Sequence, residues 1–386
     1  DAIISYGYEL YAEGEYVLAL QQFELAETVS KSSTQARLGI GKAYFQLTDY
    51  DEAKRALESV NRAGEYSEAR YYLGRIYFLK RDYSQALYQF QKAYTTDTIN
   101  DDLGYFLGAS LFETGDNPAA IDQLELDLIK HPDYDYSYYY YAQALLVAGK
   151  SDSALMAINQ ALNINALIPR FHRAKGDIYF EKQNYSTALL HYTDALNLNP
   201  AYAEARLRRG IAYGALSRYS LAIVDLEEAQ KRLPIEPLIP EMLAQYKFDT
   251  GDYEGSEAAL NRLMNIEPDR TELLFKRGLC YFYMEKYEEA IDDFSVLHDA
   301  FGADSEVQFY LGNCYEAKRD LPSAIYHYSQ AVELDFNNLR AHHNRAVVLF
   351  EVGKTEQACK AWAWLSERTD EYFSKLGKEH LELYCN

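Results

Sequence analysis

The sequence predicts an all-α solenoid of about eleven helix-turn-helix repeats, closed by one further helix at the carboxyl end. Three observations support this prediction. A small residue recurs about every 34 residues, a second small residue follows each one after twelve positions, and a large side chain follows the first after three positions. Fixed-period similarity of this length is typical of stacked repeats, in which each unit buries its faces on its neighbours.

The first small residue marks the place where two antiparallel helices cross, because a small side chain lets the two backbones approach closely. The period is constant along the chain, except that the step from Gly41 to Gly74 is one position shorter. The large residue three positions later fills the space beside the crossing, and Lys247 is the one exception. The eleven small residues are Gly7, Gly41, Gly74, Gly108, Ala142, Gly176, Gly210, Ala244, Gly278, Gly312 and Ala346.

Short turns separate the two helices of each repeat, as in the segments 14–16, 81–83 and 251–253. We expect the second helices to be N-capped by side-chain oxygens just after these turns. The expected caps are Asp51, Ser84, Ser186 and Ser220. The repeats therefore form an array over residues 1–371, with starts near 1, 34, 67, 101, 135, 169, 203, 237, 271, 305 and 339, and a capping helix over 372–386.

This pattern resembles the tetratricopeptide repeat (TPR) family from residue 1 to about residue 371. The resemblance implies a right-handed superhelix, in which the second, fifth, ninth and twelfth residues of each repeat face a concave groove that binds proteins or peptides. It also implies a scaffold or adaptor rather than an enzyme, with no cofactor. Two alternatives remain open: the recognition arm of an enzyme whose catalytic domain lies outside this chain, and a client-binding co-chaperone.

Aromatic residues occupy many of the fifth and twelfth positions. Such a row of rings suits a partner segment with hydrophobic anchors. Aromatic residues at these positions also pack between neighbouring helices, so core packing explains the same pattern. The predicted groove residues are Tyr71, Phe78, Tyr105, Phe112, Tyr139, Phe275, Phe282 and Phe309.

A local basic patch interrupts this acidic chain. Arg170 and Arg173 share a helix face, and Arg206 and Arg208 follow one repeat later. The patch could receive an acidic segment or a terminal carboxylate. Pairing with acidic residues of the stack, such as Glu204, is the alternative.

One subset of the TPR family holds a peptide's terminal carboxylates in a clamp of Lys, Arg and Asn side chains. Asn313 and Asn344 occupy the two Asn places of that clamp, and Lys378 could supply a cation. Phe309 and Ser374 stand at two of the places where the clamp needs a cation, so the predicted clamp is partial.

The composition narrows the class of partner. The formal net charge is −21, from 59 acidic and 38 basic residues, which argues against nucleic acid and against an anionic membrane surface. No apolar run approaches the roughly 18–20 residues that span a bilayer, so we expect no membrane insertion. The 37 Tyr residues favour protein contacts within a hetero-complex. The adjacent His342 and His343 do not readily face one ion, and we expect no metal site.

The four cysteines divide into two pairs. Cys280 and Cys314 hold the same place in successive repeats, about 8–10 Å apart, which is too far for a disulfide, so we expect buried thiols. Tyr372 lies midway between Cys359 and Cys385 in the sequence. If the chain reverses at Tyr372, antiparallel helices bring these two cysteines level, and we predict a disulfide.

The closing segment suggests a location. It contains Ala358, Cys359 and Trp362 in one helix, then a Leu-Gly pair at 376–377 and a terminal Tyr-Cys pair at 384–385. This order resembles the closing segment of bacterial cell-envelope TPR proteins. The chain also opens with Asp1 rather than Met, from which we expect that it is processed or cut from a longer chain. We therefore expect a periplasmic scaffold of an envelope or secretion complex, with the cytoplasm as the alternative.

Overall fold

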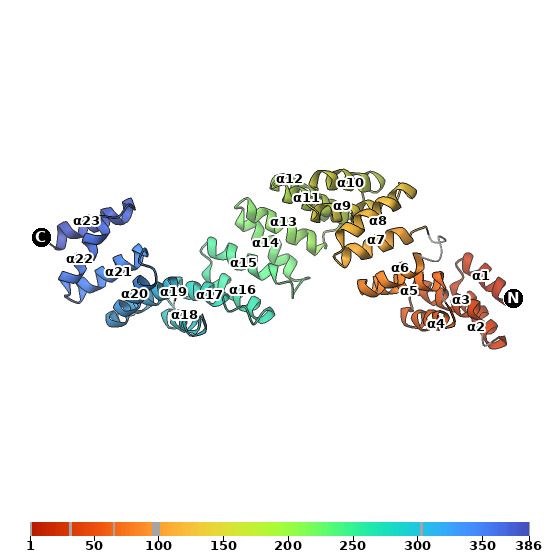
Figure 1. Cartoon of the computed structure of the whole chain (residues 1–386), viewed down its shortest axis with the longest axis horizontal. Coiled ribbons are helices and arrows are strands. Elements are labelled where there is room, and N and C mark those ends of the chain that lie inside the picture. The colour runs from red at the N-terminus through yellow and green to blue at the C-terminus, as the bar shows by residue number, and fades with distance from the viewer. Residues whose placement is uncertain (1, 31–32, 65, 95–100, 302–303, 386) are drawn as a thin grey trace. The chain divides into compact units, whose positions relative to one another are not determined.

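The computed structural model describes residues 2–30, 33–64, 66–94, 101–301 and 304–385. Within these ranges the chain forms 23 α-helices and no strand, so the predicted all-α class is confirmed (Figure 1). The chain consists of two compact units, Asp1–Ala205 and Arg206–Asn386.

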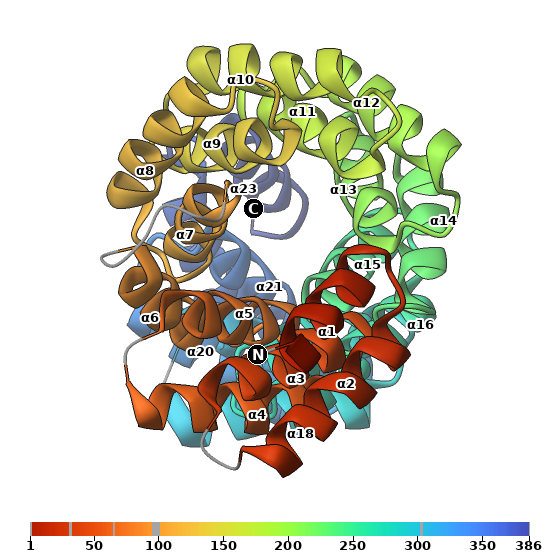
Figure 2. The same cartoon turned by 90° about the vertical axis from the view of Figure 1, so that its right-hand side faces the viewer.

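Unit 1 is built from six helix pairs, one for each predicted repeat. Figure 2 shows α7 and α9 on the inner side of this curved row, with α8 and α10 on its outer side. The helices are α1 Ala2–Ala12, α2 Tyr16–Val29, α3 Thr34–Gln46, α4 Tyr50–Ala63, α5 Ser67–Leu79, α6 Tyr83–Tyr94, α7 Leu103–Glu113, α8 Asn117–Lys130, α9 Asp135–Val147, α10 Ser151–Ile164, α11 Pro169–Glu181 and α12 Tyr185–Leu198.

Helix α13, Ala203–Ala215, crosses the boundary between the units, and the remaining ten helices belong to unit 2. From α15 onward, each odd-numbered helix again packs against the even-numbered helix that follows it. The helices are α14 Tyr219–Gln230, α15 Leu238–Asp249, α16 Tyr253–Ile266, α17 Leu273–Tyr283, α18 Tyr287–Phe301, α19 Ser305–Ala317, α20 Leu321–Leu334, α21 Leu339–Glu351, α22 Thr355–Ser366 and α23 Glu371–Tyr384.

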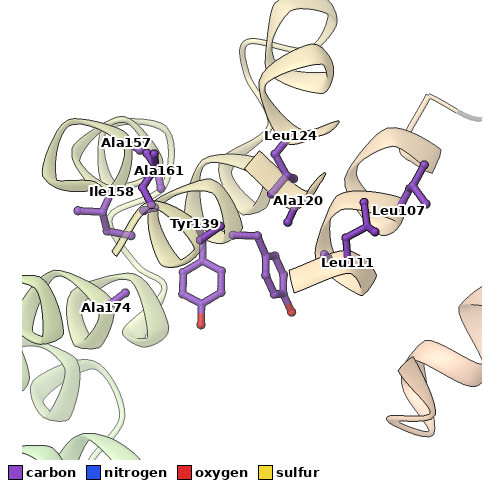
Figure 3. Close-up of a cluster of buried hydrophobic side chains, with 14 of the residues drawn as sticks. Leu107, Leu111, Ala120, Leu124, Tyr139, Ala157, Ile158, Ala161 and Ala174 are labelled. Atoms are coloured by element: carbon purple, nitrogen blue, oxygen red, sulfur yellow. The ribbon is translucent and has the colours of Figure 1, made fainter. Parts of the chain in front are cut away.

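The predicted small residues lie where the helices are closest. The second small residue of every repeat, from Ala19 to Ala358, is at most 1% exposed, and so is the large residue four positions after it. A Cβ atom added at Gly74 would lie 2.5 Å from Cε1 of Phe90, well inside contact distance. Figure 3 shows this packing in unit 1, where helices α7 to α11 contribute side chains around Tyr139.

The turn inside each repeat uses the same backbone conformation throughout the chain. One residue of each turn has a positive φ, between 56° and 89°, and five of these eleven residues are glycine. The residues are Gly14, Thr48, Arg81, Gly115, Gly149, Gln183, Ser217, Gly251, Glu285, Arg319 and Gly353. Positive φ is the left-handed region, which reverses the chain between the two helices.

The predicted N-caps Asp51, Ser84, Ser186 and Ser220 are wrong, because the second helices begin earlier than expected. In three of these repeats the cap stands two residues before the expected one, directly after the left-handed turn residue. The carboxylates of Asp49 and Asp82 accept from backbone N–H groups at 3.3 and 3.2 Å, and the Asn184 amide oxygen does so at 3.2 Å. Arg218 precedes α14 and makes no side-chain cap.

The C-terminal helix α23 begins one residue before the predicted start and packs on α22. A disulfide joins Cys359 of α22 to Cys385 at the end of α23. The small residue Gly377 allows close approach, since an added Cβ atom there would lie 2.7 Å from the backbone oxygen of Trp362. Cys280 and Cys314 are buried free thiols.

Candidate functional site

Cations lie over aromatic rings on the odd-numbered helices of unit 1. The Lys42 ammonium group lies 5.1 to 5.7 Å from the ring centroids of Tyr8, Tyr11 and Tyr72. The Arg75 guanidinium group lies 4.9 Å from the ring of Phe45. Such cation–π contacts stabilise the cations and hold the rings in place.

Three of the eight predicted groove residues are not available to a partner, and the prediction for them is corrected. Tyr71, Tyr139 and Phe309 are only 3%, 6% and 6% exposed, because their rings fill the space between neighbouring repeats. The Tyr71 hydroxyl donates to Asp102 Oδ1 at 2.6 Å, and burial raises the pKa of Tyr71 above its ordinary value. Tyr139 stacks on Phe171 with centroids 5.6 Å apart.

The other five predicted groove residues keep part of their surface exposed. In unit 1, Phe78 packs edge-on against Phe106 at 5.3 Å, and Phe112 against Tyr140 at 5.9 Å. Tyr105 lies beside Tyr140 at 5.9 Å. The two of these five that lie in unit 2 are Phe275 and Phe282.

The predicted basic patch is largely paired with groups inside each unit. In unit 1, Arg173 forms an ion pair with Asp177 and donates to the Tyr202 hydroxyl at 2.9 Å, while the Arg170 guanidinium lies 5.9 Å from the Tyr139 ring centroid. In unit 2, Arg206 lies 3.8 Å from the buried carboxylate of Asp225. Arg208 is exposed on α13. The alternative that the sequence left open, pairing with acidic residues of the stack, therefore holds for Arg173 and Arg206.

The predicted carboxylate clamp does not form. The two amides do lie together, but the Asn344 amide nitrogen donates to Asn313 Oδ1 at 3.0 Å, so each amide has an internal partner. The Tyr328 hydroxyl oxygen lies 2.7 Å from the same Asn313 oxygen and 2.5 Å from Glu316 Oε2, so both acceptors face its single proton. An acidic group therefore stands beside the two amides, where a carboxylate ligand would need a cation. Lys378 is exposed on α23.

A cleft of about 260 Å³ opens in unit 2 between α15, α16 and α17. The floor of the cleft is apolar. The Ser256 hydroxyl on this floor donates to the carbonyl oxygen of Ala244 at 2.8 Å, so these two polar groups are paired with each other. The rim is polar and exposed. The lining residues are Ala244, Gln245, Phe248, Asp249, Ser256, Leu260, Phe275, Lys276 and Leu279.

The sixth position of the repeat differs at this cleft from the sixth position of four other repeats. In four repeats an aromatic ring at the sixth position packs on the twelfth-position ring of the preceding repeat, with centroids 5.2 to 5.9 Å apart. These pairs are Tyr72 on Phe45, Phe106 on Phe78, Tyr140 on Phe112 and Tyr310 on Phe282. Lys276 takes the sixth position in the repeat after Phe248, so the cleft has a flexible cation where those four repeats have a ring.

The cleft lies at positions that the TPR resemblance assigns to the binding face. Gln245 and Phe248 are ninth and twelfth in their repeat, and Phe275 and Leu279 are fifth and ninth in the next. Of these four residues, only Phe275 was predicted from the sequence. Lys276 stands at the sixth position, where four other repeats carry a ring, but repeats without a ring there also occur, so the sequence held no clear signal for the others.

Three further charged and polar residues were missed because they come from two helices. His172 of α11 meets His191 and Asp194 of α12, with the Asp194 carboxylate 3.4 Å from His191 Nδ1. The sequence predicted no metal site, since its only adjacent histidines are His342 and His343. The two histidines of this group stand one helix hairpin apart in the sequence.

Comparisons with known proteins agree with this architecture. A tetratricopeptide repeat family model matches residues 38–101 and 275–338, and a second model, described as TPR repeat, matches residues 176–217. The structure of a human IFIT1 dimer with m7Gppp-AAAA is similar, with a TM-score of 0.51 and 16% identity, over 92% of this chain and 87% of that one.

Two curated relatives are similar in sequence over part of their length. Superkiller complex protein 3 of Mus musculus is 26% identical over 269 residues, which are 67% of this chain and 17% of the relative. The Lipoprotein NlpI homolog of Haemophilus influenzae (strain ATCC 51907 / DSM 11121 / KW20 / Rd) is 28% identical over 98 residues, 25% of this chain and 31% of the relative. The chain thus spans less than a third of either relative.

Among the described helices, none combines the length and apolar character needed to cross a bilayer. The repeated small residues, the paired helices and the family matches lead to one conclusion. The chain belongs to the tetratricopeptide repeat family.

Proposed function

We propose that this chain is a scaffold that holds a partner protein by inserting an apolar side chain of the partner into the cleft between α15, α16 and α17. The TPR fold supports protein–protein interaction, and solenoids present extended surfaces for it. The observation that carries the proposal is the position of the cleft. It opens at fifth, ninth and twelfth positions, where aromatic rings close the same space in four other repeats.

The size and lining of the cleft suit one side chain of a protein segment. Its volume of about 260 Å³ lies below the roughly 300–1,000 Å³ of small-molecule sites. An apolar floor beneath a polar rim is typical of a pocket that receives an anchor side chain. The anchor is buried away from water on the floor, while the rim pairs with the partner's backbone. Gln245 and Asp249 already hydrogen-bond each other at 2.9 Å on this rim.

The net charge of the chain further narrows the class of partner. A net charge of −21 attracts a basic surface, does not repel a neutral one, and repels the phosphates of nucleic acid. The partner is therefore a different, less acidic protein within a hetero-complex. A short single-stranded RNA serves as the negative control. We expect the chain not to bind this RNA at physiological salt.

A variant that closes the cleft tests the proposal. Lys276→Tyr introduces the ring that four other repeats carry at this position, so it fills the space with an arrangement that the chain already uses. Lys276→Ala removes the same charge and leaves the cleft open. A photo-crosslinking amino acid at Gln245 captures the partner from the native host, and affinity for that partner is then measured with each variant.

We expect Lys276→Tyr to weaken binding about tenfold or more, as loss of a central anchor does, and Lys276→Ala to bind nearly as well as the parent chain. Equal binding of the parent and Lys276→Tyr would exclude the cleft. Equal loss in both variants would show that the Lys276 charge, rather than the cavity, carries the contact.

The location in an exported compartment, within an envelope or secretion complex, is part of this proposal. The disulfide between Cys359 and Cys385 supports it, because disulfides persist mainly outside the cytosol. The similarity to a bacterial lipoprotein homologue, which extends over 98 residues, also supports this location. Trapping thiols in intact cells tests the location. Two free thiols per chain support export, and four indicate the cytoplasm.

A further inference from the structure

Three potential metal ligands meet between α11 and α12 of unit 1. The Asp194 carboxylate oxygen lies 3.4 Å from Nδ1 of His191 and 3.9 Å from Nδ1 of His172. The ligand atoms of all three side chains lie within 4.8 Å of one another. This is the spacing of groups that could share one ion.

The two imidazole nitrogens that face this group are buried and make no well-formed hydrogen bond. Nε2 of His172 lies 2.8 Å from the carbonyl oxygen of Ala166, which can only accept. Nε2 therefore carries the proton, and the lone pair is on Nδ1, which faces the group. A metal-bound histidine is commonly oriented in this way, by donating its other ring N–H to a carbonyl.

The helix hairpin fixes the three side chains before any ion binds. His191 and Asp194 are three positions apart on α12 and so share one face of that helix. His172 lies on α11, which packs along α12. The Tyr179 ring stacks on the His191 ring at a centroid distance of 5.4 Å and restricts its rotation.

We propose that His172, His191 and Asp194 form a binding site for a divalent transition-metal ion, with Zn²⁺ as the best match. Two imidazole nitrogens and one carboxylate oxygen are a known three-ligand set for zinc, whereas Mg²⁺ and Ca²⁺ prefer oxygen. Ligands about 2.0–2.2 Å from a tetrahedral ion lie about 3.3–3.6 Å from one another. The Asp194–His191 distance of 3.4 Å is already in that range, and His172 needs only a small movement.

The exposure of the group leaves one coordination position open. The Asp194 side chain is 49% exposed, while both histidine side chains are 18% exposed. Water, or a donor atom from another protein, would complete the coordination. Burial, and then the positive charge of Lys175, lower the pKa of His191. The same charge opposes a bound cation, so we expect micromolar rather than nanomolar affinity.

The test uses the full chain freed of metal with a chelator. Calorimetric titration with ZnCl₂ gives stoichiometry and affinity, and Co²⁺ absorption in the visible range reports tetrahedral nitrogen and oxygen ligands. We expect one Zn²⁺ per chain and a rise in the thermal midpoint. His172→Gln and His191→Gln should each weaken binding about tenfold or more. His131→Gln, a half-buried histidine outside the group, is the matched control and should bind as the parent does.

The proposal is wrong if Zn²⁺ and Co²⁺ do not bind, or if the three histidine variants and the parent bind with equal affinity. If a histidine variant loses helicity, Asp194→Asn decides instead. Its half-exposed carboxylate can be removed without unfolding the hairpin. Unchanged Zn²⁺ affinity in a folded Asp194→Asn chain would overturn the site.

Discussion

Two arginines of unit 2 make the same ion pair in repeats that lie two apart. Arg209 donates through Nε and Nη2 to the Asp225 carboxylate at 2.7 and 2.8 Å, and Arg277 donates in the same way to Asp293 at 2.8 and 2.6 Å. Both carboxylates are buried. Paired, two-point hydrogen bonds of this kind fix geometry as well as charge.

Removing one partner of such a pair leaves a buried charge without compensation. We predict that Arg277→Met lowers the free energy of unfolding of the surrounding helices by about 3 kcal/mol, because the Asp293 carboxylate remains buried. Hydrogen exchange of α17 and α18 measures this change. Lys360→Met, which breaks the exposed pair with Glu356, is the control and should have no measurable effect. An equal response in both variants would contradict the prediction.

His342 gives the stability of unit 2 a dependence on pH. It stacks on Trp364 at 4.0 Å, and burial, with a smaller effect from the charge of Arg345, lowers its pKa to about 4. An unfolded histidine has a pKa near 6.5. As pH falls from about 6.5 to about 4, the unfolded chain gains a proton that the folded chain does not. The stability that the neutral ring contributes is therefore fully present above about pH 6.5. It is lost progressively as the pH falls from there toward about 4.

The loss should reach about 3 kcal/mol at the lower end of this range. Urea unfolding between pH 7 and pH 4, followed by Trp fluorescence, measures it. His342→Gln cannot take up a proton and should show a flatter profile over the same range. A profile as steep as that of the parent would assign the pH dependence to other groups.

At the scale of the element, the C-terminal hairpin depends on a covalent bond. The disulfide closes a loop with a sequence separation of 26 residues between α22 and α23. Chain-entropy reasoning gives a contribution of about 3.5 kcal/mol for a loop of this length. We predict that Cys359→Ser with Cys385→Ser speeds hydrogen exchange in α23. The earlier repeats should change little, since each repeat contacts mainly its neighbours.

Replacing the buried free thiol in Cys314→Ser is the comparison for this experiment. It changes a cysteine in α19 and leaves the hairpin bond intact, so α23 should exchange as in the parent chain. If the double variant and the parent exchange α23 at the same rate, packing around Trp362, rather than the disulfide, holds the cap.

Helices and their close contacts could be predicted because they follow from local spacing. The repeat period located every helix pair, and the small residues located the crossings. The caps at Asp49 and Asp82 were missed because the left-handed turn residue, which sets where the second helix begins, is often not glycine. Thr48 and Arg81 gave no sign of it in the sequence.

The candidate sites were harder to predict, because each depends on side chains from different helices. The cleft is lined by Phe248 of one repeat and by Phe275 and Lys276 of the next, which is a relation between two repeats. The rings of Tyr71 and Tyr139 were expected in the groove, yet they pack inward. Position within the repeat cannot distinguish a ring that stays exposed in the groove from one that packs inward, since neighbouring side chains compete for the same space.

At the scale of the whole molecule, the excess of acidic residues works against folding. A net charge of −21 makes the chain repel itself, and this repulsion is screened by salt. Exposed ion pairs contribute little and should not outweigh it. We predict that the thermal midpoint rises between 0.05 and 0.5 M NaCl. A midpoint that falls over this range would mean that ion pairs, rather than net repulsion, dominate.

The turns within the repeats have a consequence for protein engineering. Six of the eleven left-handed turn residues are not glycine, and each such residue carries strain of about 1 kcal/mol. Replacing them one at a time with glycine should raise heat resistance in additive steps, because the sites lie a repeat or more apart. The six residues are Thr48, Arg81, Gln183, Ser217, Glu285 and Arg319. None of the six lines the cleft, so a thermostable version could be made that leaves the proposed partner surface untouched.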